Sequence, residues 1–341
     1  MARLKLLFLF SCFVQISNAQ QRPYYTQYIL NNYIINPAVA GIENYTDVKF
    51  SHRHQWVGLQ DAPVTTYFTI HGPFKKDEYG RETATTFRPQ GSNPRGDAYW
   101  RTYNVAPSHQ GWGFTILNDK TGPLNRLAAY GTYSYHLGIS ERTALAGGIS
   151  VGFTQMSLNA SKLNFGTINV DPAVAGSGQL NRIKPDISAG LWLYSSDYFI
   201  GLSAQQIVPQ QIAFSDNSVS LQNNKLIPHL FLSAGYRIPV GEDFSLLPSA
   251  MIRYIAPLPI GFDINAKFQY QDLIWTGLSY RYQDGFAAMV GLNISNKINI
   301  GYAYELATQS SLRLVTRGTH ELMIGFLLGN RFGDWCPRNL W

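Results

Sequence analysis

Hydrophobic residues occupy every second position of the last long segment, Thr319 to Phe332. One alternate set is almost entirely apolar and ends on an aromatic residue: His320, Leu322, Ile324, Phe326, Leu328, Asn330 and Phe332. The other set mixes acidic, small and basic residues. Because side chains alternate between the two faces of a β-strand, the segment predicts a strand with one apolar and one mixed face. That pattern suits the closing strand of a transmembrane β-barrel or the last strand of a soluble β-sandwich.

Composition favours the membrane alternative. Charged residues and aromatic residues each make up 14% of the chain, which is low and high respectively for a soluble domain. Apart from the leader, no apolar run approaches the roughly 20 residues that a transmembrane helix requires. Hydrophobicity that is high but dispersed along the chain is typical of a protein that crosses the membrane with strands.

The same alternation recurs along the chain, most clearly over Ile260–Tyr270, where six apolar residues alternate with Gly261, Asp263, Asn265, Lys267 and Gln269. A wet barrel lumen accommodates this polar set, whereas the core of a soluble sandwich would not. Further alternating segments are Val48–Trp56, Thr65–Gly72, Trp112–Ile116, Leu127–Leu137, Leu145–Phe153, Ile187–Tyr194, Tyr198–Ile207, Leu230–Ile238, Phe244–Tyr254, Leu273–Tyr282, Phe286–Ile294 and Ile298–Tyr304. We therefore predict an all-β fold over residues 48–332, a transmembrane antiparallel β-barrel of about 14 strands in the outer membrane and its lipid.

The first 19 residues predict a secretory signal peptide. Arg3 and Lys5 precede the apolar run Leu6–Val14, and small residues lead to a cleavage site after Ala19. Removal of this leader leaves Cys336 as the single cysteine, which excludes an internal disulfide and any zinc site built on two cysteines. The formal net charge of +6 is a mild excess, and an exported protein is not expected to bind nucleic acid.

Three stretches lack the alternation. Residues 20–47 are rich in aromatic residues and punctuated by proline and asparagine, and we predict a periplasmic or plug segment in or under the barrel mouth. The link Pro73–Gln110 is long and polar and predicts a periplasmic elaboration. Residues 333–341 form a C-terminal tail.

The even strand number places both termini in the periplasm. It also places the long links Ser157–Pro185, Val208–Pro228 and Ala307–Gly318 outside.

No residue pattern indicates an active site. His52 and His54 lie near Ser51, but no nucleophile motif or zinc-binding motif accompanies them, and both fall on the apolar phase, as in a head-group belt. The run Asp119–Pro123 is most simply a turn. We predict that the protein is not an enzyme and has no catalytic, cofactor or metal residues. Candidate partner-binding residues are the lumen-phase and link residues Lys49, Arg53, Gln55, Arg81, Arg88, Arg95, Arg253 and Lys267.

Short motifs in a fixed order resemble the PorP/SprF family from about Arg22 to Phe332. The residues that carry the resemblance are Gln27, Tyr28, Asn36, Pro37, Ala38, Gly41, Gln55, Trp56, Gly58, Asp61, Pro63, Asn118, Asp119 and Gly122. Tyr133–His136, Leu191–Tyr194 with Tyr198–Leu202, and the closing strand Glu321–Phe332 resemble later blocks of the family.

The resemblance implies an outer-membrane barrel of the type IX secretion and gliding system of Gram-negative bacteria. Members of that family act with the secretion machinery, or help export or hold a large secreted adhesin through the adhesin's C-terminal domain. Periplasmic parts of the apparatus are further implied partners. Two hypotheses remain open: a barrel that binds and anchors an adhesin, and a diffusion channel or transporter for a small solute.

Overall fold

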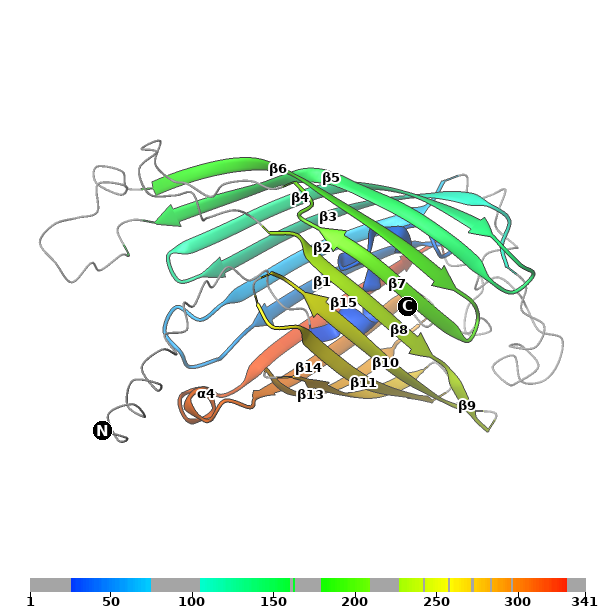
Figure 1. Cartoon of the computed structure of the whole chain (residues 1–341). Coiled ribbons are helices and arrows are strands. Elements are labelled where there is room, and N and C mark those ends of the chain that lie inside the picture. Colours follow the sequence, from blue (N-terminus) through cyan, green and yellow to red (C-terminus); the bar gives the residue numbers. More distant parts are fainter. Residues whose placement is uncertain are drawn as a thin grey trace, which may run out of the picture.

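The barrel wall is built from β-strands that cross it at a steep tilt (Figure 1). The computed structural model describes residues 26–74, 105–159, 162, 179–208, 227–241, 243–256, 258–270, 273–282, 284–295 and 297–329. The strands are β1 (Thr46–His54), β2 (Val64–Pro73), β3 (His109–Thr121), β4 (Leu124–Gly138), β5 (Ala144–Asn159), β6 (Gln179–Tyr194), β7 (Tyr198–Gln205), β8 (His229–Tyr236), β9 (Ile238–Val240), β10 (Phe244–Tyr254), β11 (Gly261–Tyr270), β12 (Ile274–Arg281), β13 (Gly285–Asn293), β14 (Ile298–Ala307) and β15 (Thr319–Leu328).

The antiparallel sheet closes on itself. β15 pairs with β1, and the two ends of the remaining order meet where β10 pairs with β11. Only Arg237 separates β8 from β9, and both strands pair with β10. The fifteen strands therefore make a barrel of fourteen passes, which confirms the predicted fold.

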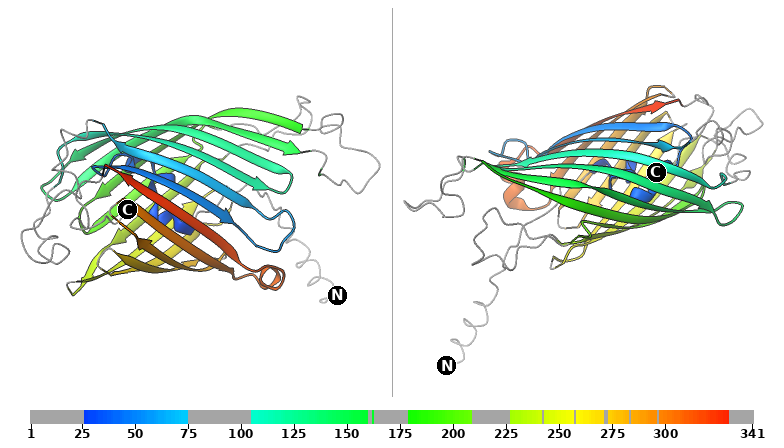
Figure 2. Two further views of the ribbon diagram at one scale, coloured as in Figure 1. Left: turned by 180° about the vertical axis from the view of Figure 1, so that it is seen from behind. Right: turned by 90° about the horizontal axis from the view of Figure 1, so that it is seen from above.

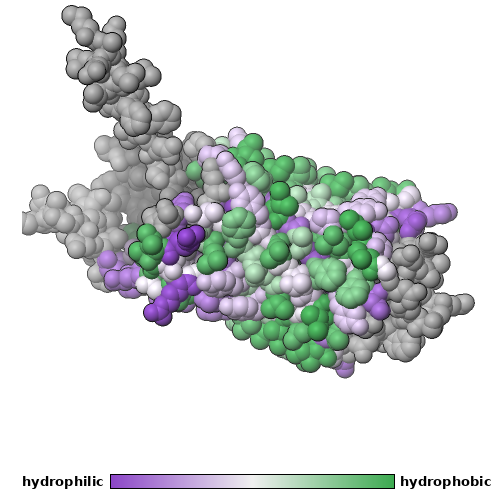
Figure 3. Space-filling model, turned by 90° about the horizontal axis from the view of Figure 1, so that it is seen from below, coloured by the Kyte–Doolittle hydropathy of each residue, from purple (hydrophilic) through white to green (hydrophobic). Residues whose placement is uncertain are grey.

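The predicted faces are also confirmed. On β15, Glu321, Met323 and Leu327 are buried inside the barrel, whereas Leu322, Phe326 and Leu328 are exposed on its outside. On β11, Asp263, Asn265, Lys267 and Gln269 are buried and alternate with exposed apolar residues. Figure 3 shows hydrophobic residues spread over the middle of one outer face, with the most hydrophilic residues toward its ends. The outside of the barrel is therefore the lipid-facing surface.

Four neighbouring strands, β3 to β6, are longer than their alternation predicted. The run Asp119–Thr121 is strand and not turn, because Asp119 and Lys120 pair with β2 and all three residues pair with β4, leaving Gly122 and Pro123 as the turn. Likewise Ser157 to Asn159 pair with Gln179 to Asn181, so the predicted link Ser157–Pro185 is shorter than expected. Paired neighbours can hold polar residues in a strand where the sequence alone suggests a loop.

The lumen contains the N-terminal segment, residues 26–45, which lies inside the barrel in both views of Figure 2. Its short 3₁₀ helices are η1 (Thr26–Leu30), η2 (Asn32–Ile34) and η3 (Pro37–Val39). Apolar side chains of this segment, among them Ile29, Ile35 and Val39, form two buried clusters with lumen-facing residues of the wall. The buried core of this barrel thus lies between the wall and its own N-terminal segment.

One α-helix, α4 (Ser310–Val315), lies between β14 and β15. Among the described residues, no helix is long and apolar enough to cross a membrane.

Candidate functional site

The two ends of the barrel have different loops. We call mouth A the end where β1 begins and β15 ends; the turns after β4, β6 and β13 lie there. Mouth B is the opposite end, with the turn at Gly122 and Pro123 and with α4. The three long links that were predicted to lie outside, Ser157–Pro185, Val208–Pro228 and Ala307–Gly318, all follow strands that end at mouth B, because successive antiparallel strands end at alternate mouths.

The N-terminal segment runs through the lumen from mouth B to mouth A. Thr26 is bonded to Glu321 and Glu305, each of which lies two residues from the mouth-B end of its strand. Ala40 is bonded to His136, which lies two residues from the mouth-A end of β4. The chain then enters β1 at Thr46. The first described residue therefore lies at the mouth opposite the one where the barrel strands begin and end.

Glycines on the lumen face of the wall receive this segment. A Cβ at Gly148 of β5 would lie 2.5 Å from the Ala38 amide nitrogen, and one at Gly190 of β6 would overlap the Asn36 amide oxygen. A Cβ at Gly111 of β3 would overlap the Ala40 carbonyl oxygen. Only residues without a side chain allow the two backbones to approach so closely. The wall and the segment are thus fitted to each other.

Polar side chains of the wall also hold the middle of the segment. Ser203 Oγ donates to the Ile35 carbonyl at 2.7 Å, and Gln205 Nε2 donates to the same carbonyl at 2.9 Å. In return, Asn36 Nδ2 donates to the Leu191 carbonyl at 3.0 Å. These bonds satisfy backbone groups that the short helices leave without partners inside the barrel.

Histidines hold the segment at mouth A. His136 Nε2 donates to the Ala40 carbonyl at 2.8 Å, and Ser134 Oγ donates to the same oxygen. His109 Nε2 lies 3.1 Å from the Gly41 carbonyl oxygen, and its ring stacks on that of His136 with the centroids 4.5 Å apart. Gly41 has a φ of 75°, a left-handed conformation that glycine adopts readily, and its N–H donates to His71 Nδ1. These imidazoles bind backbone groups of the chain itself.

Carboxylates hold the segment at mouth B. The Thr26 N–H donates to Glu321 Oε2 at 2.8 Å, and the Thr26 hydroxyl donates to Glu305 Oε2 at 2.9 Å. Gln27 Nε2 donates to the Glu321 carbonyl at 2.8 Å. Hydrogen bonds to the wall therefore hold the start of the described segment as well as its end.

An ionic belt runs along the wall at mouth B from β1 to β10. Glu305 Oε2 lies 3.2 Å from both Arg53 Nη2 and Arg281 Nη1. Asp263 continues the belt, 3.6 Å from Arg281 Nε and 3.0 Å from Arg253 Nη2. All five side chains are almost fully buried. Burial of so many charges is tolerable only because cations and anions alternate along the belt.

The candidate partner-binding residues fall into three groups. Arg53 and Arg253 belong to the ionic belt, Lys49 pairs with Asp47, and the Lys267 ammonium lies 5.4 Å from the centre of the Trp275 ring. Gln55 lies in the half-exposed loop after β1. Arg81, Arg88 and Arg95 lie outside the described residues. The lumen cations therefore have partners within the chain.

The family-signature residues gather at two places. The first group belongs to the segment in the lumen and consists of Gln27, Tyr28, Asn36, Pro37, Ala38 and Gly41. The second group meets at mouth B and consists of Gln55, Trp56, Gly58, Asp61, Pro63, Asn118, Asp119 and Gly122. There the Thr65 hydroxyl donates to Asp119 Oδ1 at 2.6 Å, and the Gly122 N–H donates to the Asp61 carbonyl at 3.1 Å. Residues that are distant in sequence thus join two hairpins.

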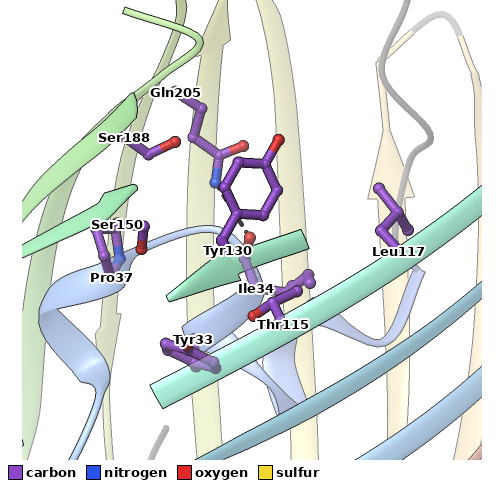
Figure 4. A pocket seen from close by; sticks show the side chains of 9 residues that line it. All are labelled: Tyr33, Ile34, Pro37, Thr115, Leu117, Tyr130, Ser150, Ser188 and Gln205. Carbon is purple, nitrogen blue, oxygen red and sulfur yellow. Dashed lines mark hydrogen bonds between the residues drawn. The ribbon is translucent and has the colours of Figure 1, made fainter. Parts of the chain in front are cut away.

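Small cavities lie between the described part of the segment and the wall. One cavity of about 30 Å³ lies between Tyr33, Ile34 and Pro37 of the segment and polar residues of the wall (Figure 4). That volume holds about one or two water molecules. Within the described ranges, no group of three or more His, Cys, Asp or Glu residues is arranged to hold a metal ion.

Sequence reasoning missed the residues that hold the segment. The glycines at positions 111, 148 and 190 break the alternation of larger side chains, and His109 and His136 lie on the lumen phase of β3 and β4. Lumen-phase glycine is the signal that could have indicated a segment packed against the inner wall.

The fold and its occupied lumen define an outer-membrane β-barrel filled by its own N-terminal segment. The model of the family described as "Type IX secretion system membrane protein PorP/SprF" matches residues 17–326, and the chain belongs to this family. The protein is accordingly an outer-membrane protein. No curated protein matches the sequence.

Several solved structures are similar to this chain at low sequence identity. The Ralstonia pickettii toluene transporter TbuX is 12% identical, over 88% of this chain and 92% of its own, with a TM-score of 0.46. The Acinetobacter baumannii outer membrane protein Omp33 is 8% identical, over 84% of this chain and 100% of its own, with a TM-score of 0.45. A Pseudomonas aeruginosa FadL homologue is 9% identical, over 89% and 94%, with a TM-score of 0.45.

Proposed function

We propose that this barrel binds a large surface adhesin through the adhesin's C-terminal domain, helps to export or anchor it, and does not conduct solute. The observation that carries the proposal is the occupied lumen. The segment 26–45 is buried along its length and bonded to the wall at mouth A, at mouth B and between them. A barrel filled in this way serves as a rigid platform and leaves no wide path for a solute.

The lumen cations also argue against direct capture of a ligand inside the barrel. Arg53 and Arg253 are paired with acidic residues of the chain, and Lys49 is paired with Asp47. Removing these partners to admit a ligand would leave buried charges uncompensated, which is strongly unfavourable. The adhesin domain therefore contacts the mouths and their loops. The periplasmic apparatus is a second partner, which would contact the link Pro73–Gln110; its residues 75–104 lie outside the described part of the chain.

Two measurements test the proposal. The purified full-length protein in planar lipid bilayers is expected to give little steady conductance. In cells, deletion of Pro89–Gly96 is expected to leave a barrel whose gel migration still changes on boiling, while surface adhesin or its movement falls.

Replacement of Pro89–Gly96 by Gly and Ser residues, at unchanged length, is the matched variant that separates the loss of these side chains from shortening of the link. Large and stable open currents in the bilayer, together with normal adhesin display in the Pro89–Gly96 deletion strain, would favour the alternative function, a small-solute channel.

A further inference from the structure

The hairpin that joins β3 to β4 at mouth B lies beside a second cavity. A cavity of about 240 Å³ opens beside it and is lined by Asn118, Lys120, Gly122, Pro123, Asn125, Ser157, Asn159 and Lys162. Its polar side chains come from three adjacent strands, since Lys120 of β3 pairs with Asn125 of β4, which pairs with Ser157 of β5. The cavity is about eight times the volume of the one inside the lumen. It is a built pocket on the outer wall.

The pocket lies just past the lipid-facing band. On β3, the exposed residues Phe114 and Ile116 are followed on the same face by Asn118 and Lys120. On β5, exposed Val151 and Phe153 are followed on the same face by Gln155 and Ser157. On β3 the outward-facing side chains therefore change from apolar to polar after Ile116, and on β5 they change after Phe153.

Strand geometry gives the depth of the pocket. Ile116 and Lys120 are four positions apart, or about 13 Å along the strand, which at a tilt of about 45° is about 9 Å along the membrane normal. The head-group layer on each side of the hydrocarbon core is roughly 5–8 Å thick. The pocket therefore opens at the outer edge of the head-group layer, within reach of a large lipid head group.

The lining defines the chemistry that fits. Lys120 and Lys162 are cations that suit a phosphate as partner. Lys162 Nζ lies 3.6 Å from Asp61 Oδ1, but both side chains of this pair are nearly half exposed, so the ammonium can donate to a second acceptor. The outward positions of β3, β4 and β5 carry no acidic residue that would repel an anion.

Asn125 provides an independent indication of a ligand. Its Oδ1 atom is buried and has no hydrogen-bond partner among the described residues. A buried acceptor without a donor is unfavourable, and once the Asn125 side chain turns toward the cavity, a hydroxyl group of a ligand would satisfy it. Cations for a phosphate and an acceptor for a hydroxyl therefore line the same cavity.

We propose that this pocket binds the head group of a membrane lipid that carries both phosphate and hydroxyl groups. Two lipid classes have this chemistry: phosphorylated glycolipids such as lipid A, and phosphatidylglycerol. In either case the bound lipid would cover the turn that joins β3 to β4, where Gly122 contacts the loop of Asp61. The lipid would then support the hairpin contact that the signature residues form.

Native mass spectrometry of the full-length protein tests the proposal. The protein is placed in phosphatidylcholine nanodiscs that contain either lipid A or phosphatidylglycerol, and the fraction of protein that retains one such lipid is measured. The wild type is expected to retain lipid A, phosphatidylglycerol or both in preference to phosphatidylcholine. Retention of lipid A alone would identify the glycolipid as the ligand, and equal retention of both would identify the shared phosphate and hydroxyl chemistry.

Two variants isolate the pocket. The double substitution Lys120→Gln with Lys162→Gln is expected to weaken retention about tenfold or more, since each tenfold corresponds to the loss of about 1.4 kcal/mol. Ser157→Trp fills the cavity without changing charge and is expected to have a similar effect. Lys297→Gln, which removes an exposed lysine in the turn between β13 and β14 at mouth A, is the matched control and should bind as the wild type does.

Three results would overturn the proposal. The first is that the wild type and both pocket variants retain the lipid equally. The second is that the wild type retains dephosphorylated lipid A as well as it retains lipid A. The third is that a polypeptide, and not a lipid, is bound at the pocket.

Discussion

Gly148 on β5 lies directly against Ala38 of the lumen segment, so close that a Cβ at position 148 would lie 2.5 Å from the Ala38 amide nitrogen. The wall strand and the segment therefore fit together only while position 148 has no side chain. Similar contacts at Gly111 and Gly190 extend this fit over three strands. The segment is thus built into the barrel, and its loss is expected to affect both stability and conductance.

Gly148→Val is expected to destabilise the barrel by about 1–3 kcal/mol, the usual effect of overpacking a buried site. The free energy of unfolding in urea, with the protein in lipid vesicles, measures it. Gly147→Val is the control, because a Cβ at Gly147 meets only Leu191 at an ordinary 3.8 Å. If the two variants unfold at the same urea concentration, the segment does not pack against the wall as described.

His136→Phe is expected to cost roughly 1–3 kcal/mol of stability. The phenyl ring keeps the volume of the imidazole but cannot donate to the Ala40 carbonyl or accept from the Tyr194 hydroxyl. Urea unfolding is again the measurement. His54→Phe on the exposed outer face should change stability by less than about 0.5 kcal/mol, and a comparable loss there would contradict the assigned role of His136.

Arg281→Met is expected to be severely destabilising, by about 3–5 kcal/mol, because it leaves part of the charge of Glu305 and Asp263 uncompensated in the buried belt. The double variant Arg281→Met with Glu305→Met removes both charges of one pair and should be more stable than the single variant. Arg313→Met on the exposed face of α4 provides the comparison. Additive effects of the two belt substitutions would show that the ion pair contributes nothing.

Thr26 lies at mouth B, so a short tag inserted directly before Thr26 is expected to be labelled from the same side of the membrane as a cysteine at Thr308. A cysteine at Ser140 in the mouth-A turn should be labelled only from the other side. An impermeant maleimide and a tag-specific antibody on intact cells measure this, with Cys336 replaced by serine. A tag that is reached together with Ser140 would contradict the path of the segment through the lumen.

Much of the barrel follows from the sequence because period-two alternation is a local property. On β11 and β15 the residues that face lipid and lumen could be assigned from every second position alone. The strand ends could not, because β3 and β6 extend as far as their neighbours offer backbone partners. For that reason Asp119–Thr121 is strand although its residues are typical of a turn.

The sequence by itself determined the fold class, the two faces of the wall and the family. Only the tertiary structure decided how the lumen is filled: that residues 26–45 run from mouth B to mouth A, and that Lys49, Arg53 and Arg253 have acidic partners within the chain. The physical reason is that alternation reports whether a side chain points inward but not what it meets there. The contacts of Gly148 with Ala38 and of Glu305 with Thr26 join residues over a hundred positions apart, and closure of the barrel alone brings them together.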